Sequence, residues 1–235
     1  MKNGSLYLIP TTISKNTESK VLSKEVYNTI NKINIFIVEN IRTSRRYIKS
    51  INPKIKIDDL TFIPFGKYDK IDFEKDCLKY FLNGYDIGII SESGSPCIAD
   101  PGSEIVKSAH EFNIRVIPIS GPSSILLSLM ASGLTGQNFC FHGYLPIEKK
   151  ERIYKLKKLE SLSKRENQTQ IFIETPYRNL KLFQSIINIC SNHTYLCIAC
   201  DLTLDTEYIA TKTIFFWKNQ IPDIHKRPTI FLISC

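Results

Sequence analysis

The sequence lacks any apolar run near the roughly 20 residues that a membrane-spanning helix needs. It also lacks a GxGxxG motif after its first predicted strand, a P-loop, an HExxH motif and a GxSxG motif. A dinucleotide-binding fold and the common methyltransferase fold therefore have no support in the sequence. The apolar part of the N-terminus is too short for a signal peptide, so we expect a cytoplasmic location.

Cysteine and histidine do not form a recognisable metal site. The seven cysteines are odd in number and scattered, which favours reduced thiols used as small core residues. Cys197 and Cys200 form a CxxC pair, but the pair lies in a predicted strand and no second pair completes a zinc site. The four histidines are isolated in the sequence, and no metal is expected.

Positive charge dominates, with a formal net charge of +8. Of the 31 basic residues 23 are Lys and 8 are Arg, and the chain is also rich in Ile and Asn. This bias is what AT-rich coding produces, so the charge favours an acidic partner such as nucleic acid only modestly.

Strands and helices alternate along the first half, which predicts an α/β fold with a mainly parallel sheet. The predicted strands of this half are residues 6–10, 33–38, 61–65, 86–91 and 115–119, and the predicted helices are 21–31, 44–51, 72–82 and 102–112. The second half predicts strands at 138–143, 170–173, 195–199 and 230–234, and helices at 122–131, 149–164 and from 178 to 189. Residues 207–217 fit a strand, or a strand followed by a short helix.

The most informative stretch is residues 87–102, an apolar strand followed by a loop of small residues and then a helix. Ligands of open α/β sheets bind at the carboxyl ends of strands, although a long turn also fits this stretch alone. Glu92 is the carboxylate among the small residues, where Gly94 would let the backbone approach a ligand. Because residues 10–12 and 39–42 also follow strands, the three polar segments are expected at one edge of the sheet.

Further polar loops occur at residues 120–124, 174–178 and 201–203. Together the loops suit a polar cofactor held between two lobes, with chemistry that depends on positioning. Residues 149–164 form a strongly basic helix that begins with Lys149, Lys150 and Arg152. It is either a solvated amphipathic face or a contact for a phosphate backbone.

Several motifs, in order along the chain, resemble those of the tetrapyrrole-methylase-like S-adenosylmethionine methyltransferases. Within this group the motifs specifically resemble those of ribosomal RNA small-subunit methyltransferase I, the cytidine 2′-O-methyltransferases. The family's Asp-Ala-Gly-x-Pro-x-Ile-Ser-Asp-Pro-Gly is similar to residues 92–102, its Pro-x-Pro-Gly-Pro-Ser-Ala to 118–124, its Gly-Phe-Leu-Pro to 143–146, its Glu-Asp-Thr-Arg to 39–42, its Tyr-Glu-Ser-Pro-x-Arg to 173–178 and its Glu-Leu-Thr to 201–203. Asn40 and Glu92 each stand where the family has Asp, and many members continue beyond the point matching Cys235.

The resemblance implies two α/β lobes of the tetrapyrrole-methylase type, residues 1–119 and 120–235, with S-adenosylmethionine in the cleft between them. Glu39, Arg42 and Glu92 are the implied catalytic residues. Substrate contacts are expected from Arg42, Arg178, Lys149, Lys150 and Arg152, and Arg178 also suits a pair with a carboxylate. The implied cofactor-binding residues are Pro10, Ser91, Glu92, Ser93, Gly94, Ser95, Pro96, Ile98, Ser123, Ser124, Glu174, Thr203 and Pro228.

Three functions agree with these residues. The first is methylation of small-subunit ribosomal RNA, expected at a ribose 2′-hydroxyl and by a homodimer. The second is methylation of a tetrapyrrole or another small molecule. The third is a non-catalytic module that binds the cofactor or RNA.

Overall fold

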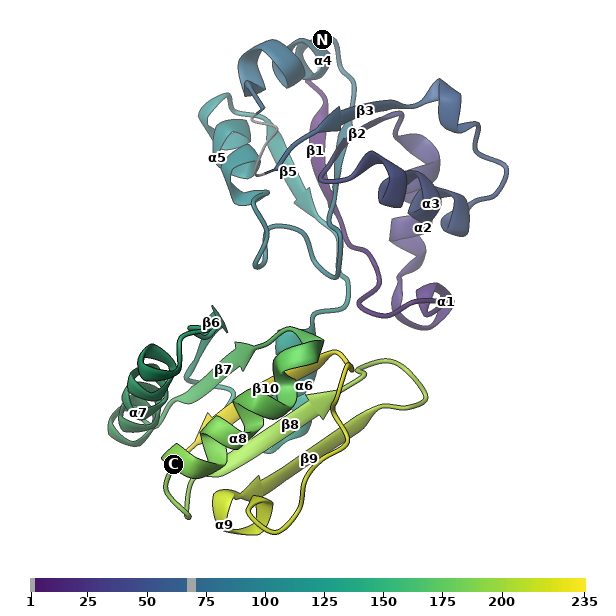
Figure 1. The fold of residues 1–235 in the computed structure, drawn as a ribbon. Helices are drawn as coiled ribbons and strands as arrows, with labels where there is room; N and C mark the ends of the chain where they lie inside the picture. The colour runs from purple at the N-terminus through teal and green to yellow at the C-terminus, as the bar shows by residue number, and fades with distance from the viewer. Residues whose placement is uncertain (1–2, 67–70) are drawn as a thin grey trace. The chain divides into compact units, whose positions relative to one another are not determined.

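The computed structural model describes residues 3–66 and 71–235, and the chain divides into two compact units (Figure 1). Unit 1 is Met1–Ser123 and unit 2 is Ser124–Cys235. Each unit contains one five-stranded sheet with helices packed against it. The mixed α/β architecture predicted from the alternation of strands and helices is confirmed.

The sheet of unit 1 is entirely parallel, with the strand order β3-β2-β4-β1-β5. Its strands β2 and β4 are rich in Ile and Val and are buried at every position, as expected for parallel strands covered on both faces. The five strands are β1 (Ser5–Ile9), β2 (Ile35–Val38), β3 (Thr61–Pro64), β4 (Ile87–Ile90) and β5 (Arg115–Pro118).

Helices cover both faces of this sheet. Phe36 and Val38 pack with residues of α2 and α3, whereas the alternate residues Ile35 and Ile37 pack with residues of α4 and α5. The helical elements of unit 1 are α1 (Glu18–Val21), α2 (Lys24–Lys32), α3 (Ile41–Ile51), η1 (Ile57–Asp59), η2 (Glu74–Leu78, a π-helical turn), α4 (Lys79–Leu82) and α5 (Ser103–Glu111).

Two helices differ from the sequence prediction. The helix predicted at residues 21–31 is divided into α1 and α2, because Leu22 is extended (φ −95°, ψ 136°) and Ser23 occupies the N-cap of α2. The helix predicted to begin at residue 44 begins three residues earlier. The Asn40 side chain accepts hydrogen bonds from the backbone N–H groups of Arg42 and Thr43, which fixes the start of α3.

Unit 2 has a mixed sheet with the order β6-β7-β10-β8-β9, in which β6 pairs with β7 in parallel and the other pairs are antiparallel. A strand and a short helix occupy the ambiguous residues 207–217. The elements are α6 (Ser124–Ser132), β6 (Phe139–Tyr144), α7 (Lys149–Glu166), β7 (Thr169–Ile173), η3 (Pro176–Arg178), α8 (Asn179–Ile189), β8 (Tyr195–Cys200), β9 (Tyr208–Thr213), α9 (Ile214–Trp217) and β10 (Thr229–Ser234).

The core of unit 2 lies between its sheet and the helices α7, α8 and α9, with Leu156, Phe183 and Trp217 at its centre. Cys197 and Cys200 are buried free thiols in β8, as the strand assignment predicted. Within the described ranges no cluster of three His, Cys, Asp or Glu side chains is suited to a metal ion. None of the helices among those residues is long and apolar enough to cross a membrane.

Candidate functional site

Three polar segments meet at the carboxyl edge of the sheet in unit 1. The register pairs Ile9 with Ile90 and Val38 with Ile90, so β1, β2 and β4 end at the same level. Pro10, Glu39 and Ser91 follow these ends directly. The shared edge predicted from the sequence is therefore confirmed.

The loop after β4 is held to the segment after β1 by hydrogen bonds. The Ser91 hydroxyl donates to the Gly94 carbonyl over 2.6 Å, and the Thr11 backbone N–H donates to the same carbonyl over 2.9 Å. Gly94 has a positive φ of +72°, and a Cβ there would lie 3.0 Å from the Pro122 carbonyl oxygen. The positive φ and the close Pro122 carbonyl both favour glycine at this position, and the approach of a ligand to its backbone stays a prediction.

The segment that leads out of unit 1 is packed against the same loops. A Cβ on Gly121 would lie 2.1 Å from Cβ of Pro10, and the Ser95 hydroxyl donates to the Pro122 carbonyl over 3.3 Å. Pro10 and Pro96 are buried, whereas Ser123 is half-buried at the end of the unit. Pro10 and Ser95 therefore make contacts within unit 1, and Pro96 is buried in it.

The second half of the loop is organised by Asp100. Its Oδ1 accepts hydrogen bonds from the backbone N–H groups of Cys97 (2.8 Å) and Gly102 (2.9 Å). Cys97 and Ala99 have left-handed backbone conformations, with φ of 66° and 62°. In the same loop Ser93 is exposed and Ile98 is 54% exposed, so these two residues present groups that a ligand can contact.

Two carboxylates at this edge have different surroundings. Glu92 accepts a hydrogen bond from the Thr43 hydroxyl over 2.6 Å. Burial raises the pKa of the half-buried Glu39 carboxyl, and the nearby carboxylates of Asp100 and Glu92 raise that pKa further. A carboxyl with a raised pKa is better suited to accept a proton near neutral pH.

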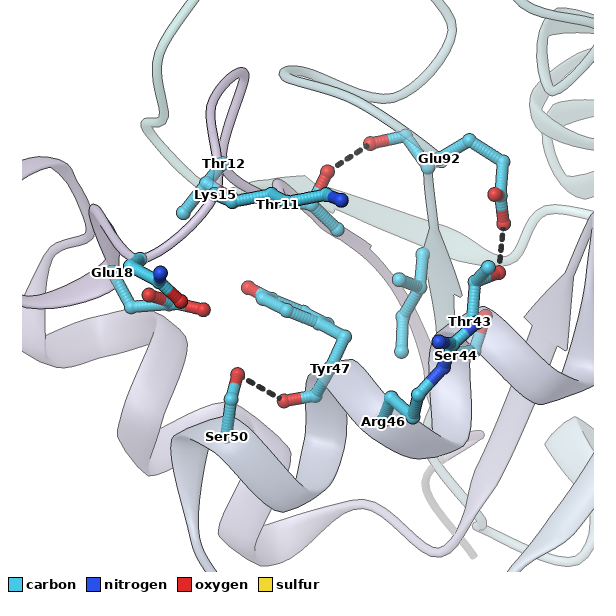
Figure 2. A pocket seen from close by; sticks show the side chains of 13 residues that line it. Thr11, Thr12, Lys15, Glu18, Thr43, Ser44, Arg46, Tyr47, Ser50 and Glu92 are labelled. Atoms are coloured by element: carbon cyan, nitrogen blue, oxygen red, sulfur yellow. Dashed lines mark hydrogen bonds between the residues drawn. The ribbon is translucent and has the colours of Figure 1, made fainter. Parts of the chain in front are cut away.

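Helix α3 borders a pocket of about 500 Å³ in unit 1, which residues 11–18 and the end of β4 also line (Figure 2). The Tyr47 ring extends from α3 toward residues 11–18, and its hydroxyl donates to the Pro10 carbonyl over 2.6 Å. Burial raises the pKa of Tyr47 well above the ordinary tyrosine value, so the hydroxyl remains a donor. Lys15 and Arg46 supply positive charge to the lining.

Sequence reasoning missed Lys15, Arg46 and Tyr47. A signal was present, because Arg42 and Arg46 are four residues apart and therefore lie on one side of a helix. Arg42 itself is exposed on α3, and its guanidinium makes no hydrogen bond or ion pair with other residues in the described part of the chain.

A second polar edge occurs in unit 2. The register pairs Ile230 with Ile173 and Thr229 with Cys200, so the ends of β7 and β8 lie beside the start of β10. This register brings together the predicted residues Glu174, Thr203 and Pro228. Thr203 is held in a left-handed conformation (φ 75°), the kind of local strain that clusters at functional sites.

Ion pairs brace this second edge. The buried Glu174 accepts hydrogen bonds from Nε (3.0 Å) and from a terminal nitrogen (2.7 Å) of Arg178. Arg227 donates through Nε to Asp201 over 2.9 Å. Two roles were open for Arg178, a substrate contact and a pair with a carboxylate, and in the structure Arg178 forms the pair. Ser124, another predicted site residue, is the first residue of α6 and belongs to neither ion pair.

The basic helix α7 differs from its prediction at one residue. Lys149 and Lys150 are exposed, as a phosphate contact requires. Arg152 is only 4% exposed, and it donates hydrogen bonds to the carbonyls of Pro146 (3.3 Å) and Ile147 (2.6 Å) and to the Ser185 hydroxyl (3.1 Å). The guanidinium of Arg152 is occupied within unit 2 and is not available to a substrate phosphate, which corrects the prediction of a substrate contact at this residue.

The structure is similar to the crystal structure of the methyltransferase CobJ, with a TM-score of 0.62 and 14% sequence identity. The similarity covers 98% of this chain and 94% of the CobJ chain. The fold is therefore the methyltransferase fold of the tetrapyrrole-methylase type, as the motifs predicted. No family model matches the chain.

Relatives in sequence show to which family of methyltransferases the chain belongs. The chain is 31% identical to ribosomal RNA small subunit methyltransferase I of Buchnera aphidicola subsp. Schizaphis graminum over 239 residues, which cover 99% of this chain and 78% of that protein. The proteins of the same name from Bacillus subtilis and Escherichia coli O157:H7 are 29% and 27% identical, over 92% and 88% of this chain and 71% and 68% of those proteins. The chain belongs to the ribosomal RNA small subunit methyltransferase I family.

Proposed function

We propose that this protein is an S-adenosylmethionine-dependent methyltransferase that modifies a ribose 2′-hydroxyl of small-subunit ribosomal RNA. The observation that carries the proposal is the similarity to a ribosomal RNA small subunit methyltransferase I over 99% of the chain. Likeness to CobJ supports the fold but not a tetrapyrrole substrate, because the identity is 14%.

The residues of unit 1 fit the cofactor. When bound, S-adenosylmethionine supplies a methyl group on a positively charged sulfur. The loop after β4 exposes a hydroxyl at Ser93, a carboxylate at Glu92 and an aliphatic side chain at Ile98. These groups match the hydroxyls, the positive charge and the apolar ring of the cofactor. The contacts expected from Ser123 in unit 1 and from Ser124, Glu174, Thr203 and Pro228 in unit 2 stay predictions.

Glu39 is the proposed proton acceptor. A ribose hydroxyl that attacks a methyl group must lose its proton, and a carboxyl with a raised pKa accepts one near neutral pH more readily. Burial and neighbouring carboxylates raise the pKa of Glu39 in this way, while Glu92 is engaged by the Thr43 hydroxyl. We therefore assign proton transfer to Glu39 and orientation of the reacting groups to Glu92.

Substrate contacts are proposed from exposed cations. Arg42 on α3 and Lys149 and Lys150 on α7 are accessible to phosphates, and guanidinium groups bind phosphate oxygens in a forked geometry. Arg178 is a weaker candidate because Glu174 already accepts two of its hydrogen bonds. A cytoplasmic location follows from the proposed ribosomal substrate, and the family resemblance supports a homodimer.

A methyl-transfer assay tests the proposal. Small ribosomal subunits from a strain that lacks the enzyme, free RNA and porphyrinogens would each be incubated with the protein and tritiated S-adenosylmethionine. We expect label in the RNA of small subunits. Label only in the porphyrinogen would replace the RNA substrate with a small molecule, and no saturable cofactor binding in calorimetry would contradict any methyltransferase role.

A further inference from the structure

The pocket beside α3 has the size and the polarity of a nucleotide site. Its volume of about 500 Å³ lies within the range of roughly 300–1,000 Å³ found for small-ligand pockets. Its lining residues other than Ile90 carry polar groups, with hydroxyls at Thr11, Thr12 and Ser50, and the Tyr47 ring adds an aromatic face. It borders Ser91 and Glu92, so a molecule inside it lies next to the carboxyl edge of the sheet.

Arg46, the arginine that lines this pocket, belongs to a cluster of a residue type that is scarce in this chain. Lysines outnumber arginines by 23 to 8 in the chain, yet three of the eight arginines lie within residues 42–46 of α3. Arg152, Arg178 and Arg227 each use several guanidinium nitrogens to bind protein groups. At these three positions the forked geometry of the guanidinium is used.

Arg46 has its fork available. Its Nε donates to the Arg42 carbonyl over 3.4 Å, and its two terminal nitrogens make no hydrogen bond or ion pair with the other described residues. Its neighbour Arg45 differs, because Arg45 approaches Asp58 at 3.7 Å and lies over the Phe62 ring. Lys15 is likewise exposed and without an ion pair among those residues, so two available cations line one pocket.

Arg46 and Glu18 lie at opposite ends of the pocket, and a second carboxylate, Glu92, lies at the Arg46 end, where the Thr43 hydroxyl donates to it. Figure 2 shows Arg46 at the end where Thr43 and Glu92 lie, and Glu18 at the opposite end, beyond the Tyr47 hydroxyl. The hydrogen bond from Tyr47 to the Pro10 carbonyl fixes the ring between these ends. A ligand that carries an anion at one end and an amino group at the other would match both.

We propose that this pocket binds one unstacked nucleotide of the RNA substrate, with its phosphate at Arg46 and Lys15 and an amino-bearing base at Glu18. The proposal rests on the proposed function and adds the substrate-binding residues to it. Enzymes that modify single nucleotides in RNA reach them unstacked, and carboxylates accept hydrogen bonds from exocyclic amino groups of bases.

Two matched variants distinguish nucleotide binding in this pocket from non-specific attraction of RNA by positive charge. Arg46→Ala removes the forked donor, and Arg45→Ala removes a neighbouring charge that points to Asp58. We expect Arg46→Ala to raise the KM for small subunits about ten- to a hundredfold, the usual loss for a charge-assisted hydrogen bond. Arg45→Ala is expected to raise it less than about threefold, and the dissociation constant for S-adenosylmethionine is expected to stay unchanged in both variants.

The base contact has its own variant. Glu18→Gln exchanges the acceptor carboxylate for an amide, and Glu25→Gln on the neighbouring helix α2 is its control. Substrates with cytidine or uridine at the modified position would be compared, and we expect Glu18→Gln to reduce the preference for the amino-bearing base about tenfold. Thermal unfolding of each variant identifies any loss of folding, and Arg46→Lys, which keeps the charge, is expected to recover part of the RNA affinity.

The outcomes distinguish the pocket from the function as a whole. If the wild-type protein transfers no methyl group to small-subunit RNA, the proposed function fails. If it does so and Arg46→Ala behaves like Arg45→Ala, the nucleotide pocket is refuted while the function stands. Weaker binding of S-adenosylmethionine by Arg46→Ala would instead assign the pocket to the cofactor and would also refute the proposal.

Discussion

Helices α3 and α7 are both basic, and they use their charges differently. Helix α3 spans 11 residues, begins at a strand end with a side-chain cap on Asn40, and borders a pocket. Helix α7 spans 18 residues, has no side-chain cap, and distributes its exposed lysines along its length. The shorter helix therefore holds cations at a defined place, whereas the longer one offers diffuse attraction to a phosphate backbone.

The two helices also differ in how they use arginine. The exposed fork of Arg46 on α3 is available to a ligand, whereas Arg152 on α7 binds two backbone carbonyls and a hydroxyl inside unit 2. Counting basic residues would rank α7 first. Burial and hydrogen bonding reverse that order, which shows that available donors, not total charge, indicate a binding site.

The largest expected effect is on stability. Arg152→Ala leaves the carbonyls of Pro146 and Ile147 without their donor, and we expect it to lower the free energy of unfolding of unit 2 by about 2–4 kcal/mol. Urea titration followed by the fluorescence of Trp217, the single tryptophan of the chain and buried in unit 2, would measure it. Exposed Lys150→Ala should change the value by less than about 0.5 kcal/mol. If Arg152→Ala left the stability unchanged and weakened RNA binding, Arg152 would be a substrate contact instead.

The helix starts provide the next contrast. Asn40→Ala removes the acceptor for two backbone N–H groups and should destabilise unit 1 by about 1 kcal/mol. Glu148→Ala at the start of α7 removes no such bond and should have little effect. Hydrogen exchange of the first amides of each helix would report both changes. Equal loss of protection in the two helices would contradict the difference in capping.

The diffuse attraction assigned to α7 predicts a dependence on salt. Replacing Lys149 and Lys150 together by Ala should weaken RNA binding about threefold at moderate salt. It should also make the slope of log K against log salt shallower by about 1.4, which is two contacts to single-stranded RNA. Fluorescence anisotropy over a salt series measures both quantities. An unchanged slope would show that the start of α7 does not contact phosphate.

The smallest expected effect concerns pH. Because the pKa of Glu39 is raised in the folded protein, folding favours its protonated form. This contribution is fully present below the pKa of the unfolded chain and is lost as the pH rises through the folded value. Glu39→Gln should therefore raise the melting temperature slightly at pH 7 and flatten its dependence on pH above 4.5. Glu148→Gln is the exposed control. Identical pH profiles for the two variants would show that Glu39 does not contribute to the pH dependence of stability.

The shared edge of unit 1 was predictable because buried parallel strands place all their carboxyl ends on one side. Burial of Arg152 is also encoded in the sequence, since it lies four residues before Leu156 on the apolar side of α7, although the charge of an arginine by itself favours exposure. The pocket was not predictable. Tyr47 reaches Pro10 across 37 residues of sequence, and periodicity within α3 does not reveal that contact.

The close packing of Gly121 against Pro10 has a mechanical consequence. A Cβ at position 121 would lie 2.1 Å from Cβ of Pro10, so any side chain there would force the proline to shift. The Pro10 carbonyl accepts the hydrogen bond of the Tyr47 hydroxyl, and Tyr47 lines the pocket beside α3. The absence of a side chain at Gly121 therefore helps to keep one wall of the pocket in place.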